Sequence, residues 1–126
     1  MRRVDSVRRA LAEVLAVLVA DEGGFGPPLT SNEEGLVLLT EAIEAAGLKP
    51  GVSGAIAVDV AATHFYRQER YRWAAGGGDY EASKLVQVLE TWAQRYPLVS
   101  LEDGLAEDDW WAGAYSMIGW GSVCRF

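Results

Sequence analysis

Three short apolar runs in this sequence each lead into an acidic residue, and this repetition constrains the fold more than any other feature. The runs are residues 15–20, 55–58 and 98–101, and the acids that follow them are Glu22, Asp59 and Glu102. The acids are 37 and 43 positions apart (22 to 59 to 102), which is enough chain for a strand, a helix and their connections. An apolar run without alternation is typical of a strand covered on both faces of a parallel sheet. The spacing therefore predicts an α/β fold of repeated βα units.

Helical patterns fill the intervals between these runs. Apolar residues with a 3.6-residue period predict an amphipathic helix over residues 6–18. Periodicity does not fix where this helix ends and the first strand begins. Ser31 followed three residues later by Glu34 is a capping box, and the helix that it starts is predicted to end near Gly47. A third amphipathic helix is predicted over Glu81–Arg95. The segment between the second strand and this helix, rich in arginine, tyrosine and glycine, is predicted to be a loop.

In a parallel α/β barrel the three acids would meet at one face. Residues just past the carboxyl ends of barrel strands converge on one mouth, where active sites of this fold are found. Carboxylates gathered in a low-dielectric pocket repel one another unless a cation lies between them, and hard oxygen ligands suit Mg²⁺. The spacing therefore suggests a metal site. The alternative is that each acid caps a helix at a βα loop, and spacing alone slightly favours this simpler alternative.

Charge and composition argue against several classes of partner. The 126 residues include 11 basic and 18 acidic ones, and the net charge of -7 repels nucleic-acid phosphates and anionic membrane surfaces. No stretch reaches the roughly 18 apolar residues of a membrane span. Cys124 is the only cysteine, so an intrachain disulfide is impossible, and with one histidine there is no Cys/His zinc cluster. A reducing cytosol is the expected location.

The motifs around the acids resemble those of the enolase family. The segments DEGGFGP at 21–27 and SNEE at 31–34 look like the family's DEGGF(A/G)P and SNEEAL. AIAVDVAATHFY at 55–66 is similar to IA(L/M)DVAASEFY, and YPLVSLEDGLAEDD at 96–109 is similar to YPIVSIEDPLAEDDW. The likeness extends over about residues 5–111 and implies a partial (β/α) barrel of three βα units, not closed.

The resemblance implies an activity and roles for single residues. Enolases are lyases of glycolysis and gluconeogenesis that dehydrate 2-phosphoglycerate to phosphoenolpyruvate with Mg²⁺. Glu22 matches the family's acid that helps the 3-hydroxyl leave, and Asp59 and Glu102 match two of the three carboxylates that hold the metal. The segment from Ala61 through the glycines matches a loop that closes over substrate. The family is homodimeric and cytoplasmic, and its members are also reported at the cell surface as adhesion partners.

The chain also departs from the family pattern. The base lysine, the third metal carboxylate and the phosphate-binding Arg and Ser have no counterpart here, so negligible dehydratase activity is expected of the isolated chain. Residues 1–111 are predicted to be a fragment of the barrel domain, and residues 112–126 a divergent tail that could be out of frame. Two other functions stay open. One is a non-catalytic binding or adhesion protein, and the other is a different enolase-superfamily dehydratase or racemase.

Simpler roles are expected for several other side chains. Arg67, Arg70 and Arg72 could steer an anionic substrate, but a solvated loop accounts for them more simply. His64 is expected at the surface rather than as an acid or base. Packing rather than a ligand cage is expected of three aromatic residues, which are Trp73, Trp92 and Trp110.

Overall fold

The computed structural model describes residues 24–109 together with Arg9. In chain order the elements are α2 (Asn32–Ala45), β1 (Ile56–Asp59), the 3₁₀ helix η2 (Ala62–Phe65), β2 (Tyr66–Arg67), β3 (Arg70–Arg72), β4 (Asp79–Tyr80), α3 (Ala82–Arg95) and β5 (Leu98–Glu102). The predicted alternation of helix and strand is confirmed over this range. The helix predicted over residues 6–18 and the strand predicted over residues 15–20 lie outside the described residues.

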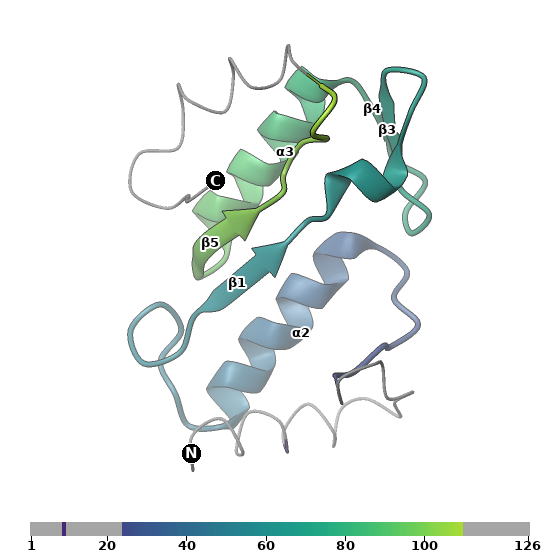
Figure 1. Cartoon of the computed structure of the whole chain (residues 1–126). Coiled ribbons are helices and arrows are strands. Elements are labelled where there is room, and N and C mark those ends of the chain that lie inside the picture. Colours follow the sequence, from purple (N-terminus) through teal and green to yellow (C-terminus); the bar gives the residue numbers. More distant parts are fainter. Residues whose placement is uncertain (1–8, 10–23, 110–126) are drawn as a thin grey trace.

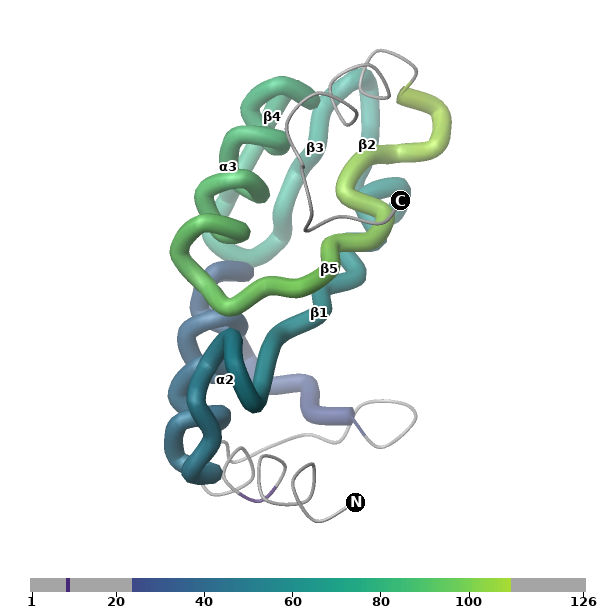
Figure 2. The backbone as a smooth tube through the Cα atoms, turned by 90° about the vertical axis from the view of Figure 1, so that its left-hand side faces the viewer, coloured from purple at the N-terminus to yellow at the C-terminus, as the bar shows by residue number. Residues whose placement is uncertain are grey.

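The strands β1 and β5 lie side by side and parallel, and their arrowheads point the same way (Figure 1). The connection between them contains α3, as expected for a βα crossover. Within the described residues they form a two-stranded sheet that does not close into a barrel, which is the open α/β arrangement predicted. The helices α2 and α3 lie on the same side of this sheet (Figure 2).

The start of α2 is capped in nearly the predicted way. The Ser31 hydroxyl oxygen accepts a hydrogen bond from the Glu34 N–H at 3.3 Å, as in a capping box. The carboxylate of Glu34 turns back, but it accepts from the N–H of Thr30 (2.7 Å) and from the Thr30 hydroxyl (2.8 Å). The return bond therefore reaches one residue beyond the N-cap, because the Thr30 hydroxyl adds a second donor there.

Replacing Ser31 with alanine is expected to lower the free energy of unfolding by about 0.5–2 kcal/mol, because the Glu34 N–H loses its acceptor. Urea unfolding of the two proteins at neutral pH measures the difference. The Thr30 backbone N–H holds the pKa of Glu34 below its ordinary value, so the Glu34 contribution should be lost as pH falls through that lowered pKa. Ser31→Asp, which keeps a capping oxygen, is the control. Equal stability of Ser31→Ala and the parent would contradict the capping role.

Both helices end near the predicted residues. Gly47 follows α2 with a φ of +74°, a left-handed conformation in which a side chain would be strained. Its N–H donates to the Glu44 carbonyl at 2.8 Å, which satisfies one of the free carbonyls of the last turn. At the end of α3, which is Arg95, the Tyr96 N–H donates to the Trp92 carbonyl at 2.9 Å. Gly47 thus ends α2, and Pro97, two residues past Arg95, prevents α3 from continuing. Both ends lie where the sequence predicted them.

The core lies between the helices and the inner face of the sheet. In the register of β1 with β5, Val58 lies opposite Leu101, and both side chains pack into the hydrophobic cluster formed with the helices. The helices contribute most of the other buried residues, which include Leu36, Ile43, Leu85, Leu89 and Trp92. Trp73 stacks on Trp92 with ring centroids 5.4 Å apart. The packing role predicted for these two tryptophans is confirmed, and Trp110 lies outside the described residues.

The segment between β1 and α3 is more regular than the sequence indicated. The prediction of a loop is wrong for β2, β3 and β4, which pair as a three-stranded antiparallel sheet. Tyr66, Tyr71 and Tyr80 lie opposite one another across it. Arg70 donates to Asp79 at 2.6 Å, so this arginine is ion-paired on a strand rather than free in a solvated loop. Strands of two or three residues are too short to show a period in the sequence.

Candidate functional site

Two of the three predicted site residues are neighbours at the carboxyl ends of β1 and β5. Asp59 lies directly opposite Glu102 in the parallel register, and residues so paired on adjacent strands project to the same face. Both residues are exposed, on the face away from the helices, because Val58 and Leu101 point into the core. The structure therefore brings Asp59 and Glu102 together. Glu22 lies outside the described residues.

The carboxylate of Asp59 is oriented by its own backbone. Its Oδ1 atom accepts a hydrogen bond from the Ala61 N–H at 3.0 Å, which leaves the second oxygen for another partner. Ala61 has a φ of +49°, an unfavourable conformation for a residue with a side chain. Asp59 does not cap η2, whose N-cap is Ala61 and which has no side-chain cap bond; its carboxylate instead closes a local turn with the residue two positions on. This turn fixes the carboxylate without using up both of its oxygens.

A second strained residue follows Glu102. Asp103 has a φ of +48°, and its carbonyl accepts from the Ala62 N–H at 2.9 Å. The carbonyl of Glu102 accepts from the Val60 N–H, also at 2.9 Å. Backbone conformations of this kind cost about 1–3 kcal/mol each and persist where the surrounding structure enforces them. The two strands thus stay bonded to each other past the residues that carry the carboxylates.

The donor set fits a hard cation. Within the described part of the chain the Glu102 side chain makes no hydrogen bond or ion pair, so both of its oxygens can bind a ligand. Mg²⁺ is usually held by one or two carboxylates together with waters and substrate phosphates, and two neighbouring carboxylates match that pattern. Among residues 24–109 and Arg9 there is no group of three or more His, Cys, Asp or Glu that could hold a metal ion. The described site therefore offers two ligands, not three.

A nearby cavity is less suited to the predicted chemistry. It has a volume of about 210 Å³ and is lined by Asn32, Leu36, Val58, Asp59, Val60, Phe65, Trp73 and Trp92. Six of these eight residues are apolar, so the cavity would desolvate a phosphorylated acid without compensating its charge. The candidate site is therefore the exposed face with Asp59 and Glu102, and the cavity lies beside it.

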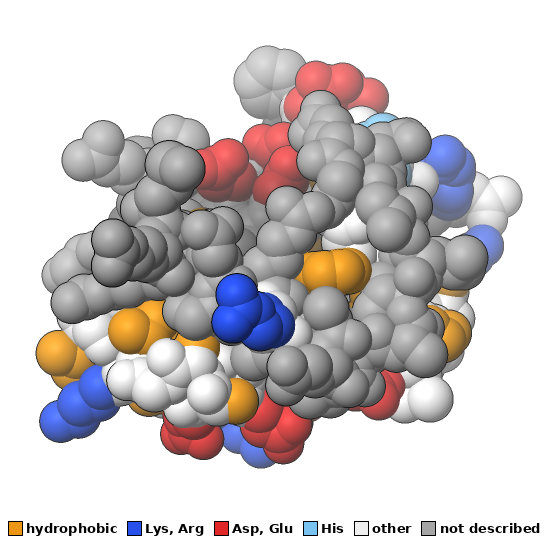
Figure 3. Space-filling model, turned by 90° about the horizontal axis from the view of Figure 1, so that it is seen from below, with side chains coloured by type: hydrophobic (Ala, Val, Ile, Leu, Met, Phe, Trp, Pro, Cys, Tyr) orange, Lys and Arg blue, Asp and Glu red, His pale blue; other side chains and the backbone are white. Residues whose placement is uncertain are grey.

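Seen from below, acidic side chains lie at opposite edges of the molecule, with described hydrophobic side chains between them (Figure 3). His64, in η2, is exposed as expected. None of the described helices has the length and hydrophobicity needed to cross a membrane.

Comparison with known proteins gives the decisive finding. The family described as "Enolase, C-terminal TIM barrel domain" matches residues 2–121, which is nearly the whole chain. The chain belongs to the enolase family. A curated relative, the enolase of Bdellovibrio bacteriovorus, is 46% identical over 107 residues, which cover 83% of this chain and 25% of the relative. The chain thus spans about a quarter of the length of this enolase.

The enolase match bears on two earlier expectations. It confirms the resemblance drawn from the motifs around Glu22, Asp59 and Glu102 and the assignment to the enolase barrel. The matched range extends through residue 121 and so includes part of the predicted divergent tail. The division of the chain at residue 111 stays a prediction, because residues 110–126 lie outside the described part of the structure.

One part of the site was missed in the sequence. Tyr71 is buried in β3 with its hydroxyl bonded to residues that follow Glu102. The signal was present as a single tyrosine between Arg70 and Arg72, an alternation that places one side chain inside and two outside. Three residues are too few for that alternation to be distinguished from a loop by sequence alone.

Proposed function

We propose that this chain forms part of an enolase-type active site that dehydrates 2-phosphoglycerate to phosphoenolpyruvate in the cytoplasm, with Mg²⁺ as cofactor. In this proposal Asp59 and Glu102 hold the metal ion, and Glu22 helps the 3-hydroxyl of the substrate to leave. The single observation that supports it most is the pairing of Asp59 with Glu102 at the ends of adjacent parallel strands. Family membership supports the choice of reaction.

The proposed dehydration requires positive charge beside Asp59 and Glu102. Removal of the weakly acidic α-proton of 2-phosphoglycerate leaves a carboxylate-stabilised dianion, and bound Mg²⁺ would supply the charge that neutralises it. The chain's own part is to hold and orient the ligands. The Ala61 N–H fixes one oxygen of Asp59, and the bond from the Val60 N–H to the Glu102 carbonyl holds the strand ends together. Preformed ligand geometry of this kind removes a reorganisation cost from the reaction.

The 126 residues alone should lack turnover. The base, the third metal carboxylate and the phosphate-binding groups expected of the family have no counterpart in the sequence, and a closed barrel needs roughly 200 residues or more. Purified chain is therefore expected to show no Mg²⁺-dependent formation of phosphoenolpyruvate, followed by absorbance. Measurable turnover that requires Mg²⁺ would contradict this. The homodimer of the family and a role at the cell surface remain further predictions.

A graft tests the proposed function directly. The matched 107-residue region of the Bdellovibrio bacteriovorus enolase is replaced by the corresponding residues of this chain, and phosphoenolpyruvate formation is compared with the parent enzyme. We expect the graft to be active and to depend on Mg²⁺, because Asp59, Glu102 and Glu22 would occupy the family's positions. A graft that folds, as judged by circular dichroism, and has no activity would refute the proposal.

A further inference from the structure

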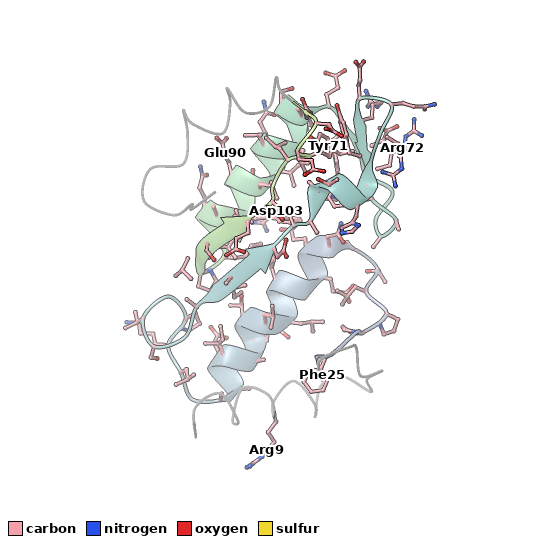
Figure 4. All side chains as sticks on the ribbon, in the orientation of Figure 1. Arg9, Phe25, Tyr71, Arg72, Glu90 and Asp103 are labelled. Carbon is pink, nitrogen blue, oxygen red and sulfur yellow. The ribbon has the colours of Figure 1, made fainter. Side chains whose placement is uncertain are left out.

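The segment after Glu102 is anchored to the small antiparallel sheet by one buried tyrosine. Tyr71 is 0% exposed. Its hydroxyl oxygen accepts from the Ala106 N–H at 3.0 Å, and its O–H donates to Oδ2 of Asp109 at 2.8 Å. In Figure 4 Tyr71 lies beyond Asp103, at the end of the molecule toward which β1 and β5 point. One side chain thus holds two points of the segment that leaves the candidate site.

Other contacts attach the same segment to residues between β1 and β3. The Thr63 hydroxyl oxygen accepts from the Glu107 N–H at 3.3 Å, and the Ala62 N–H donates to the Asp103 carbonyl. Residues 103–109 therefore bond at four places to residues 62–71. Of these contacts, only the ones to Tyr71 come from a fully buried side chain, so they are the least exposed to competition from water.

The Tyr71 hydroxyl is well suited to act as a permanent donor. Its ring packs at 4.7 Å from that of Tyr66 and edge-on to that of Phe65 at 6.1 Å. Burial raises the pKa of the hydroxyl well above its ordinary value, so it stays protonated at any pH at which the protein is handled. Because the acceptor on Asp109 is a carboxylate, the bond belongs to the stronger class. Loss of the hydroxyl would leave the Ala106 N–H unsatisfied in a buried place.

We propose that Tyr71 is a positioning residue that fixes the carboxyl end of β5, and with it Glu102, relative to Asp59. Its hydroxyl holds the segment after Asp103, and the bonds from the Val60 and Ala62 N–H groups transmit this to the end of β1. The role of Glu102 as a metal ligand rests on the proposed function. The anchoring itself does not.

Hydrogen exchange of single backbone amides tests the anchoring in the full 126-residue chain. Tyr71→Phe keeps the ring and removes the hydroxyl, and we expect exchange at the Val60 and Ala62 amides to rise about tenfold or more relative to amides in the middle of α2. Tyr66→Phe makes the same chemical change on the neighbouring ring, whose hydroxyl makes no hydrogen bond to the described residues. It should leave these ratios unchanged. If Tyr71→Phe accelerates all amides equally, or only those of residues 106–109, the proposal is wrong.

Two further measurements distinguish a failure of the anchoring by Tyr71 from a failure of the proposed metal binding. Asp109→Asn retains an acceptor for the tyrosine, so it should fold even if Tyr71→Phe does not, and a smaller rise confined to the same amides is expected. The Mg²⁺ affinity, measured by titration with MgCl₂, should then be about 10–100-fold lower in Tyr71→Phe than in the parent. Losses of this size are typical when a residue that orients a metal ligand is changed. Equal Mg²⁺ affinities would overturn the positioning role. If the parent does not bind Mg²⁺ at all, the metal proposal fails and the exchange ratios still decide the anchoring.

Discussion

In the grafted enolase, Asp59→Asn is expected to lower kcat/KM by more than about 100-fold. This exceeds the loss of about 10–100-fold that is typical when a residue that only orients a metal ligand is changed. Asparagine has nearly the same shape, and its amide oxygen can still accept from the Ala61 N–H. The turn that orients residue 59 should therefore survive. What is lost is one negative charge beside Glu102, so the expected defect is in metal binding. Steady-state rates at increasing MgCl₂ measure it.

The control for this variant is Asp108→Asn. Asp108 is exposed and lies in the segment after β5, so the substitution removes the same charge from the same region without touching the strand ends. We expect activity close to that of the unmodified graft. Partial recovery of the Asp59→Asn variant at high Mg²⁺ would support weakened binding. Parental activity of Asp59→Asn at low Mg²⁺ would remove Asp59 from the metal site.

Leu101→Ala is expected to have the largest effect on stability, about 2–5 kcal/mol in the free energy of unfolding. Leu101 precedes Glu102 in β5 and is 1% exposed in the core, so truncation leaves a cavity between the sheet and the helices. Domains are commonly stable by only about 5–15 kcal/mol, so this loss would be a large share of the total stability. Urea unfolding followed by far-UV circular dichroism measures this, through the loss of the helices that pack on Leu101.

The matched variant is Val99→Ala on the same strand. Val99 is 58% exposed, and substitutions of exposed side chains usually change stability by less than about 0.5 kcal/mol. A large loss for Leu101→Ala with almost none for Val99→Ala would support the inward position of Leu101 and the exposed position of Val99, which the irregular register before Ser100 leaves without a partner on β1. Similar losses for both variants would mean that Val99 is covered in solution, which would contradict its exposed position.

Much of the described fold could be predicted because its determinants are local. The capping serine and Gly47 delimit α2, and an apolar run ending in an acid marks each of β1 and β5. The parallel pairing followed from the length of the connection, so the meeting of Asp59 with Glu102 could be predicted too. The register, in which Asp59 lies directly opposite Glu102, agrees with the strand ends predicted from the sequence. Only the structure establishes it.

What could not be predicted depends on contacts between distant residues. The strands β2, β3 and β4 are held by pairing with one another, and none is long enough to have a pattern of its own. The burial of Tyr71 requires Ala106 and Asp109, which lie far along the chain and have no sequence signal that links them to a tyrosine. The return bond of Glu34 reached Thr30 instead of Ser31 because a hydroxyl there offered a second donor.

The bonds from the Val60 N–H to the Glu102 carbonyl and from the Ala62 N–H to the Asp103 carbonyl have a consequence for motion at the site. They join the two strand ends into one stiff unit, with a strained residue on each side. A displacement of either end would carry the other with it. The distance between the carboxylates of Asp59 and Glu102 would then change little while their common position shifts, so the ligand spacing can be preserved during any opening or closing of the face around it.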